Sequence, residues 1–270
     1  MSSDPLTRNT DLAVVPFRAQ GFSPRARPAA PWIAFIAAIA IWQASSSLGW
    51  LNPVFLPSPE SIARSLYELT INGTLPRHVL VSLARIGSGW IIGTATGILI
   101  GLSLGLFTTA RAIGLPFVSA IFPIPKIALL PLLILWLGIG ETPKVATIAL
   151  GVFFPTAIAV YTGVGAVPIN LIRMAQSFNV PFLDIVRKVV LPGALPSIIG
   201  GFRISASIAL LLVVAAEMIG AETGIGAFVL QAGNLMQTDQ LLAGVVTLSI
   251  LGLLIGKLIG TLEARLLRWR

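Results

Sequence analysis

Few residues in this chain have side chains that do chemistry by themselves. There is no cysteine, which excludes disulfides, thiolate metal sites and a cysteine nucleophile. His78 is the single histidine, so a site built from several histidines is excluded and we predict no metal site. No acid stands at helical spacing beside His78, so we expect it to lie at an interface rather than to act as a general base. An enzyme is therefore not expected.

Lys126 is the charge that fits its surroundings least, because it stands in an apolar run with several prolines. Each proline removes a backbone donor and bends a helix, and in lipid such breaks survive only where protein or water satisfies the freed carbonyls. A lysine in mid-membrane also costs on the order of 3 kcal/mol. One interpretation is a transport pathway, with these candidate residues: Pro123, Pro125, Lys126, Pro131 and Glu217. The other is that Lys126 snorkels or pairs with an acid such as Glu217. Both stay open.

A polar island over residues 170–192 separates two long apolar runs. Apolar residues fall at helical spacing on either side of Asn179, which predicts two short amphipathic helices. They are Leu171, Met174, Ala175 and Phe178, then Phe182, Ile185, Val186 and Val189. Such a pair, projecting from a membrane protein, predicts a docking site for a soluble partner.

Local signals define the ends of these two helices. Asn179 tolerates the left-handed conformation that ends a helix, and Pro181 suits the first turn of the next one. Leu191-Pro192 is expected to close it. Asp184 and Lys188 are four residues apart with the acid first, which favours an ion pair, and Arg187 shares their polar side.

The composition requires lipid around the chain. Of 270 residues, 56% are apolar and 10% charged, with a mean hydropathy of +0.92. We predict an all-α membrane protein with a flexible cytosolic tail over residues 1–30 and a six-span domain over 31–270. The spans are expected at about residues 32–48, within 85–111, and at 113–137, 145–165, 198–219 and 241–258.

Lysine and arginine gather in the N-terminal tail, the 170–192 segment and the C-terminus, whereas Arg64, Arg77, Arg85 and Lys144 fall on the other side. This bias predicts that both termini are cytosolic, and it explains the net charge of +8 better than nucleic-acid binding does. All ten acids, Glu217 included, are expected in loops or at span ends, which disfavours a secondary transporter.

Glycine recurs at every fourth residue in the second expected span. The row consists of Gly89, Gly93, Gly97, Gly101 and Gly105. On a helix this spacing makes a smooth groove that another backbone can approach closely. Packing within the subunit and packing across a dimer both stay open. Elsewhere, Ser58-Pro59-Glu60 predicts the start of a short helix on the outer membrane surface.

The 170–192 segment resembles the cytosolic signature of binding-protein-dependent ABC importer permeases. That pattern is Glu-Ala-Ala, three residues, Gly, and a spacer ending in Leu-Pro. Its positions fall on Arg173-Met174-Ala175, Asn179 and Leu191-Pro192. The stretches FLPSPESI (55–62), SLARIGSGW (82–90), FPIPKIALLPLLILWLGIGE (122–141) and AAEMIGAETGIG (215–226) resemble the nitrate/sulfonate/taurine branch, so the likeness covers nearly everything after Trp32. Arg173 in place of Glu reverses a charge, whereas Asn179 in place of Gly keeps access to positive φ.

The resemblance implies a permease subunit of the bacterial inner membrane, moving a small anion such as a sulfonate, taurine or nitrate. It implies two copies forming the pathway, two ATPases docked on the 170–192 segment, and a periplasmic binding protein. The ATPase contacts it implies are Arg173, Ala175, Phe178, Asn179, Phe182, Asp184, Arg187, Leu191 and Pro192. ATP and Mg²⁺ would bind the ATPases, because this chain lacks Gly-x4-Gly-Lys-Ser/Thr. The alternatives are a secondary transporter or an ABC permease for another small solute.

Overall fold

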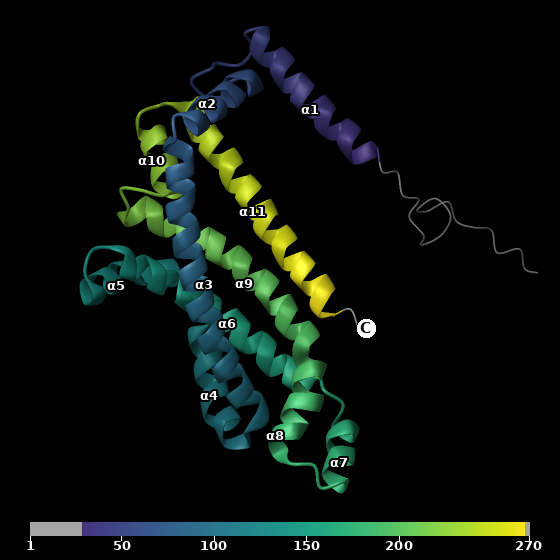
Figure 1. Cartoon of the computed structure of the whole chain (residues 1–270). Helices are drawn as coiled ribbons and strands as arrows, with labels where there is room; N and C mark the ends of the chain where they lie inside the picture. The colour runs from purple at the N-terminus through teal and green to yellow at the C-terminus, as the bar shows by residue number, and fades with distance from the viewer. Residues whose placement is uncertain (1–28, 268–270) are drawn as a thin grey trace, which may run out of the picture. The chain divides into compact units, whose positions relative to one another are not determined.

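The computed structural model describes residues 29–267, and every regular element in that part is a helix (Figure 1). The all-α prediction is confirmed. Nearly all of the expected tail over residues 1–30 lies outside the described residues, as do Arg268 and Arg270. The chain divides into two compact units, residues 1–51 and residues 52–270.

The first unit contains α1 (Ala30–Ser47), which corresponds to the first expected span. Its apolar stretch Trp32–Ser47 is shorter than those of the long helices. At 1.5 Å per residue it covers roughly 24 Å, less than the roughly 30 Å of a bilayer core.

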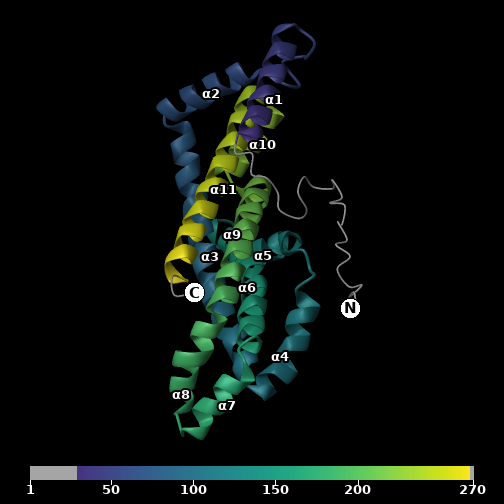
Figure 2. The same cartoon turned by 90° about the vertical axis from the view of Figure 1, so that its right-hand side faces the viewer.

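The second unit is a bundle of long helices joined by short ones (Figures 1 and 2). Its elements are α2 (Pro59–Ile71), α3 (Thr74–Leu106), α4 (Thr108–Ile121), η1 (Lys126–Leu129), α5 (Leu130–Leu137), α6 (Glu141–Gly165), α7 (Ile169–Ser177), α8 (Phe182–Ile185), η2 (Val186–Val190), α9 (Leu191–Gly220), α10 (Ile225–Asn234) and α11 (Thr238–Leu266). As predicted, α2 begins beside Ser58, whose hydroxyl accepts from the Ser61 amide.

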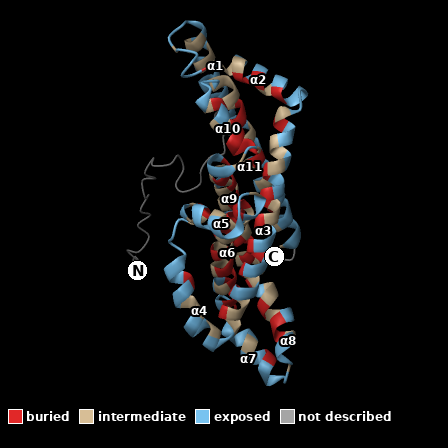
Figure 3. Ribbon diagram, turned by 90° about the vertical axis from the view of Figure 1, so that its left-hand side faces the viewer, coloured by how far each residue is buried: buried red, intermediate tan, exposed pale blue. Residues whose placement is uncertain are grey.

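The core of this unit lies where α3, α6 and α9 pack together. Ile148 and Val152 of α6 and Val213 of α9 are fully buried there. Figure 3 shows the buried residues concentrated along these helices, while the outer faces are exposed. Because those faces are also apolar, they suit lipid or another membrane protein rather than water.

Within residues 29–267, four helices are long and apolar enough to cross a membrane, or five if one bent pair is a single span. The protein is therefore a multi-pass membrane protein, and the sixth span stays a prediction. The expected span over residues 113–137 is not a continuous helix. It is broken into α4 and the η1–α5 pair, which meet at 88°. Pro123 and Pro125 lie in the break, where they remove two backbone donors.

The helix that contains the second expected span begins before Arg85, the charged residue that marks the start of that span in the sequence. α3 starts at Thr74 and includes Arg77, His78 and Arg85. Arg85 was expected in an outer loop, but it is 3% exposed and lies within the helix. The helix tolerates this charge because acids from distant parts of the chain surround it.

Candidate functional site

The 170–192 segment forms the end of the bundle opposite α2 and α10 (Figures 1 and 2). Its inner side packs on the long helices. Ala175 and Ile185 are buried in one cluster with Val160 of α6 and Ile198 of α9, and Ile172 packs against that cluster. The segment is thereby packed against both helices.

The outer side of the segment is apolar and exposed. Met174 is 55%, Phe178 75% and Phe182 56% exposed. The expected apolar stripe of the first helix is thus split: Ala175 faces the core, whereas Leu171, Met174 and Phe178 face outward. The helical spacing of apolar residues predicts which of them share a side of the helix, but it does not predict which side packs on the protein. In this helix the larger apolar side chains lie on the exposed side.

Polar residues of the segment also lie outward. Arg173, Asn179 and Arg187 are exposed. Lys188 donates to Asp184 Oδ2 at 3.1 Å, the ion pair that the sequence predicts. Asn179 has φ of +54°, so the residue that ends the first helix does adopt the left-handed conformation.

The expected end of the second helix at Leu191-Pro192 is wrong. Residues 182–220 form one helical run, with a π-helical turn, η2, immediately before Leu191. The Leu191 amide donates to the Val186 carbonyl, five residues back. Proline has no amide hydrogen and its ring would clash with the carbonyl four residues earlier, so a wider turn lets the helix continue past it. The second half of the segment is therefore continuous with α9.

The glycine row lies against α6 within the same subunit. A Cβ on Gly97 would be 2.9 Å from the Phe153 carbonyl oxygen, and one on Gly101 would be 2.6 Å from the Ala157 carbonyl oxygen. A Cβ added at Gly89, Gly93 or Gly105 would likewise be too close to α6, where it would meet Ile148, Val152 or Val164, respectively. The groove thus receives the α6 backbone, as glycine-lined membrane helices do.

Lys126 does not pair with Glu217. Its Nζ donates to the carbonyls of Ile121, Phe122 and Ile124 at 2.7–3.1 Å and lies 4.4 Å from the centroid of the Phe154 ring. The lysine thus caps carbonyls at the break between α4 and η1. Pro123 and Pro125 are exposed beside it, and Pro131 is in the first turn of α5.

Glu217, expected outside, is instead 1% exposed near the C-terminal end of α9. Arg85 Nη1 donates to Glu217 Oε1 at 2.7 Å and to the Thr223 carbonyl at 2.6 Å. Ser82 donates to the same carboxylate, and the Gly226 amide donates to Oε2 at 2.9 Å. These bonds tie α3, α9 and the start of α10 together.

Glycine is required where the chain passes this carboxylate. Gly224 has φ of +128°, and a Cβ there would collide with the Glu217 carboxyl group. Its amide donates to His78 Nδ1 at 3.0 Å. His78 is therefore an internal contact of α3 with the turn before α10.

Two more charged residues complete the group that we call the charge cluster: Arg85, Glu217, Glu141 and Lys144. Arg85 holds Glu141 with two nitrogens, with Nη2 2.7 Å from Oε1. Lys144, 6% exposed, lies 3.3 Å from the same Oε1. Glu141 itself has a side chain that is 60% exposed. Sequence patterns miss this cluster because Arg85 and Glu217 are 132 residues apart.

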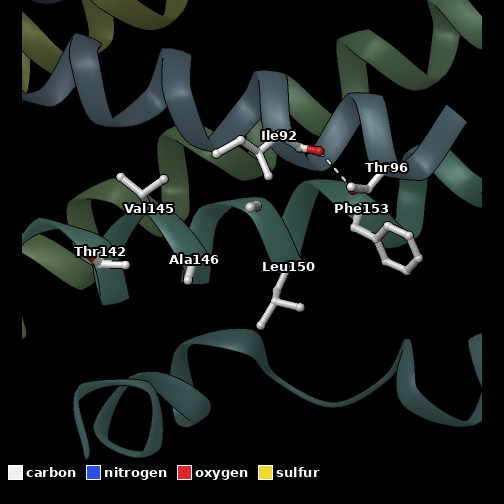
Figure 4. Close-up of a pocket in the computed structure, with 8 residues that line it drawn as sticks. Ile92, Thr96, Thr142, Val145, Ala146, Leu150 and Phe153 are labelled. Carbon is white, nitrogen blue, oxygen red and sulfur yellow. Dashed lines mark hydrogen bonds between the residues drawn. The ribbon is translucent and has the colours of Figure 1, made fainter. Parts of the chain in front are cut away.

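A pocket of about 500 Å³ lies between α3 and α6 (Figure 4). Ile92 and Thr96 face it from α3, and Val145, Leu150 and Phe153 from α6. Thr96 Oγ1 is already bonded to the Ile92 carbonyl at 2.8 Å. Because none of its lining residues carries a charge, this pocket offers no partner for a desolvated anion.

These features define a multi-pass helical membrane protein that carries an exposed apolar surface on the 170–192 segment, at one end of the bundle. Residues 93–268 match the family described as binding-protein-dependent transport system inner membrane component, and the chain belongs to that family. Members of this family are membrane permeases of transport systems and are not themselves enzymes.

Two curated relatives cover most of the chain. The Taurine transport system permease protein of Escherichia coli is 36% identical over 236 residues, 86% of each chain. A protein of Bacillus subtilis named "Putative aliphatic sulfonates transport permease protein" is 34% identical over 232 residues, 86% of this chain and 84% of its own. A chain of the inward-facing MetNI methionine ABC transporter superposes with a TM-score of 0.58 at 25% identity, covering 71% of this chain and 95% of that one.

Proposed function

We propose that this chain is the permease subunit of an ATP-driven importer for small anions, with alkanesulfonates and the amino-sulfonate taurine as the preferred substrates and nitrate as a smaller, inorganic candidate. The relatives named for taurine and for aliphatic sulfonates support this substrate class. Two copies would form the pathway by alternating access, and a periplasmic binding protein would deliver the substrate.

The observation that carries the proposal is the exposed apolar side of the 170–192 segment. Met174, Phe178 and Phe182 are each more than half exposed, and the segment continues directly into α9. We assign this surface to an ATPase, which would bind ATP and Mg²⁺. Two ATPases on two such segments would move α6 and α9 when they close, because the inner side of the segment packs on both helices.

The membrane orientation follows from this assignment. The segment would lie in the cytosol with both termini, and the charge cluster would lie toward the periplasm at the opposite end of α6. The break at Pro123–Pro131 and Lys126 stays our candidate for a pathway wall, since the helix is interrupted there and its residues are partly exposed.

Uptake by the reconstituted complex tests the proposal. The chain is placed in proteoliposomes with its cognate ATPase, and the binding protein is supplied outside with radiolabelled taurine, ethanesulfonate or nitrate. We expect uptake that requires ATP and the binding protein and that prefers the sulfonates. Uptake driven by an ion gradient without ATP would contradict the mechanism, and ATP-driven uptake of an uncharged solute alone would contradict the substrate class.

A further inference from the structure

A second, smaller cavity lies directly beside the charge cluster. It has a volume of about 230 Å³ and lies between α5, the first turn of α6 and the last turns of α9. Its walls are apolar, formed by Leu130, Ile134, Ile139, Ala216 and Gly220, and Lys144 is the charged residue among those that line it. One cationic group on an apolar cavity matches a ligand with one anionic head and a short hydrocarbon tail.

The present partner of Lys144 is a replaceable one. Lys144 and Arg85 are both buried, and both are bound to the carboxylate of Glu141, whose side chain is 60% exposed. The other acid of the cluster, Glu217, is enclosed by Arg85, Ser82 and the Gly226 amide. Of the two carboxylates, only Glu141 can therefore turn into solvent without leaving a buried acid unpaired.

The charge balance identifies the class of ligand. With Glu141 in place, two cations face two carboxylates and the cluster is neutral. With Glu141 turned outward, two buried cations face the single carboxylate of Glu217, which leaves one positive charge. A buried uncompensated charge is costly, so the vacated place favours a monoanion. A sulfonate carries that charge, and its oxygens suit the paired N–H groups of Arg85 that now hold Glu141.

We propose that this cavity is a sulfonate-binding subsite of the permease, in which the sulfonate displaces Glu141 from Lys144 and Arg85 and the alkyl chain lies against Ile134, Ile139 and Ala216. The inference rests on the proposed function, since it names where an anionic substrate would first be held within the membrane subunit. Glu141 then acts as an internal competitor that closes the subsite when no substrate is present.

Affinity for the subsite should depend on the length of the ligand's alkyl chain. Each methylene buried on the apolar wall contributes about 0.8 kcal/mol, so affinity should rise roughly fourfold per carbon from methanesulfonate to butanesulfonate. Nitrate and inorganic sulfate have no tail and should bind weakly.

The test is equilibrium binding of radiolabelled butanesulfonate to the permease–ATPase complex in lipid nanodiscs. We expect Lys144→Met to weaken binding by roughly tenfold or more, because it removes the cation that the head contacts. Glu141→Gln should instead tighten binding, because it removes the competing carboxylate. Lys257→Met, which removes an exposed lysine of α11, serves as the matched control and should leave binding unchanged.

Opposite signs separate a binding role from a structural one. If the Glu141 and Lys144 pair only stabilises the fold, both variants should weaken binding alike or leave it unchanged, and either result would overturn the subsite. The proposal would also be overturned if the wild-type protein did not bind butanesulfonate, or if its affinity did not depend on the length of the ligand's alkyl chain. If Lys144→Met fails to fold, Ile134→Trp supplies the same test by filling the cavity. Sulfonate uptake that persists beside such a negative result would leave the proposed function standing.

Discussion

Arg85 of α3 and Glu217 of α9 form a hydrogen-bonded ion pair of 2.7 Å, with exposed fractions of 3% and 1%. The pair joins two helices that each pack on α6, and Glu217 further accepts from the Gly226 amide at the start of α10. Arg85 also binds Glu141, whereas Arg85 is the one cation paired with Glu217 among the described residues, so the buried acid depends on this arginine. This relationship fixes the end of the bundle opposite the 170–192 segment.

Removing the buried acid should destabilise the protein. We expect Glu217→Gln to cost about 3–5 kcal/mol, because it leaves part of the Arg85 charge uncompensated in a buried site. Glu263→Gln is the control, since Glu263 pairs with Arg203 at 2.6 Å in a partly exposed position, where loss of an ion pair costs about 1 kcal/mol or less. Thermal unfolding in detergent compares the two. Equal melting temperatures for both variants would contradict the role given to Glu217.

The glycine row offers a matched pair of substitutions on one helix. Gly97→Leu should lower stability and membrane yield by an amount equivalent to roughly 1–3 kcal/mol or more, because its Cβ meets the α6 backbone. Gly87→Leu should be tolerated, since nothing lies within 4 Å of a Cβ there. Fluorescence-detected size exclusion measures both. A stable Gly97→Leu protein would remove the argument for close packing.

The outer side of the 170–192 segment should be required for ATPase binding. We expect Phe178→Asp, at a side chain that is 75% exposed, to abolish co-purification with the ATPase without changing insertion or melting temperature. Tyr67→Asp on α2, at a side chain that is 67% exposed, is the control and should retain the ATPase. Unchanged co-purification of Phe178→Asp would count against the docking assignment.

The left-handed residue between α7 and α8 makes a separate prediction. Asn179→Gly should preserve transport-coupled ATP hydrolysis, because glycine adopts φ of +54° without cost. Asn179→Val should strain the turn by about 1–2 kcal/mol and reduce coupling. The ATPase rate of the reconstituted complex, with and without binding protein, measures both. Equal coupling in the two variants would mean that the turn geometry is not needed.

Local chemistry predicted the features that depend on neighbours in sequence. The left-handed turn at Asn179 after α7, the Asp184–Lys188 pair and the start of α2 beside Ser58 each follow from a few adjacent residues, and the structure contains all three. The spacing of the glycines predicted a groove but not its occupant, because the matching residues of α6 have no glycine pattern of their own.

Features that depend on distant residues could not be predicted in the same way. The sequence pattern places Arg85 and Glu217 at the ends of spans, because neither residue has an opposite charge at helical spacing that would predict a buried ion pair. Their burial follows only from the packing of α3 against α9. Pro192 likewise indicated a helix end, whereas the π-helical turn before it lets the helix continue. These positions are where tertiary structure overrides the local rule.

The most direct measurement of the central claim is the side of the membrane on which the 170–192 segment lies. The chain has no cysteine, so one introduced at exposed Ser177 would be a unique label for a membrane-impermeant maleimide, with Glu68→Cys on α2 marking the opposite end. We predict that Ser177→Cys reacts only in inside-out vesicles, is protected by the bound ATPase, and that Glu68→Cys reacts only from the periplasmic side. Reaction of Ser177→Cys from the periplasmic side, or in both orientations without ATPase protection, would contradict the account.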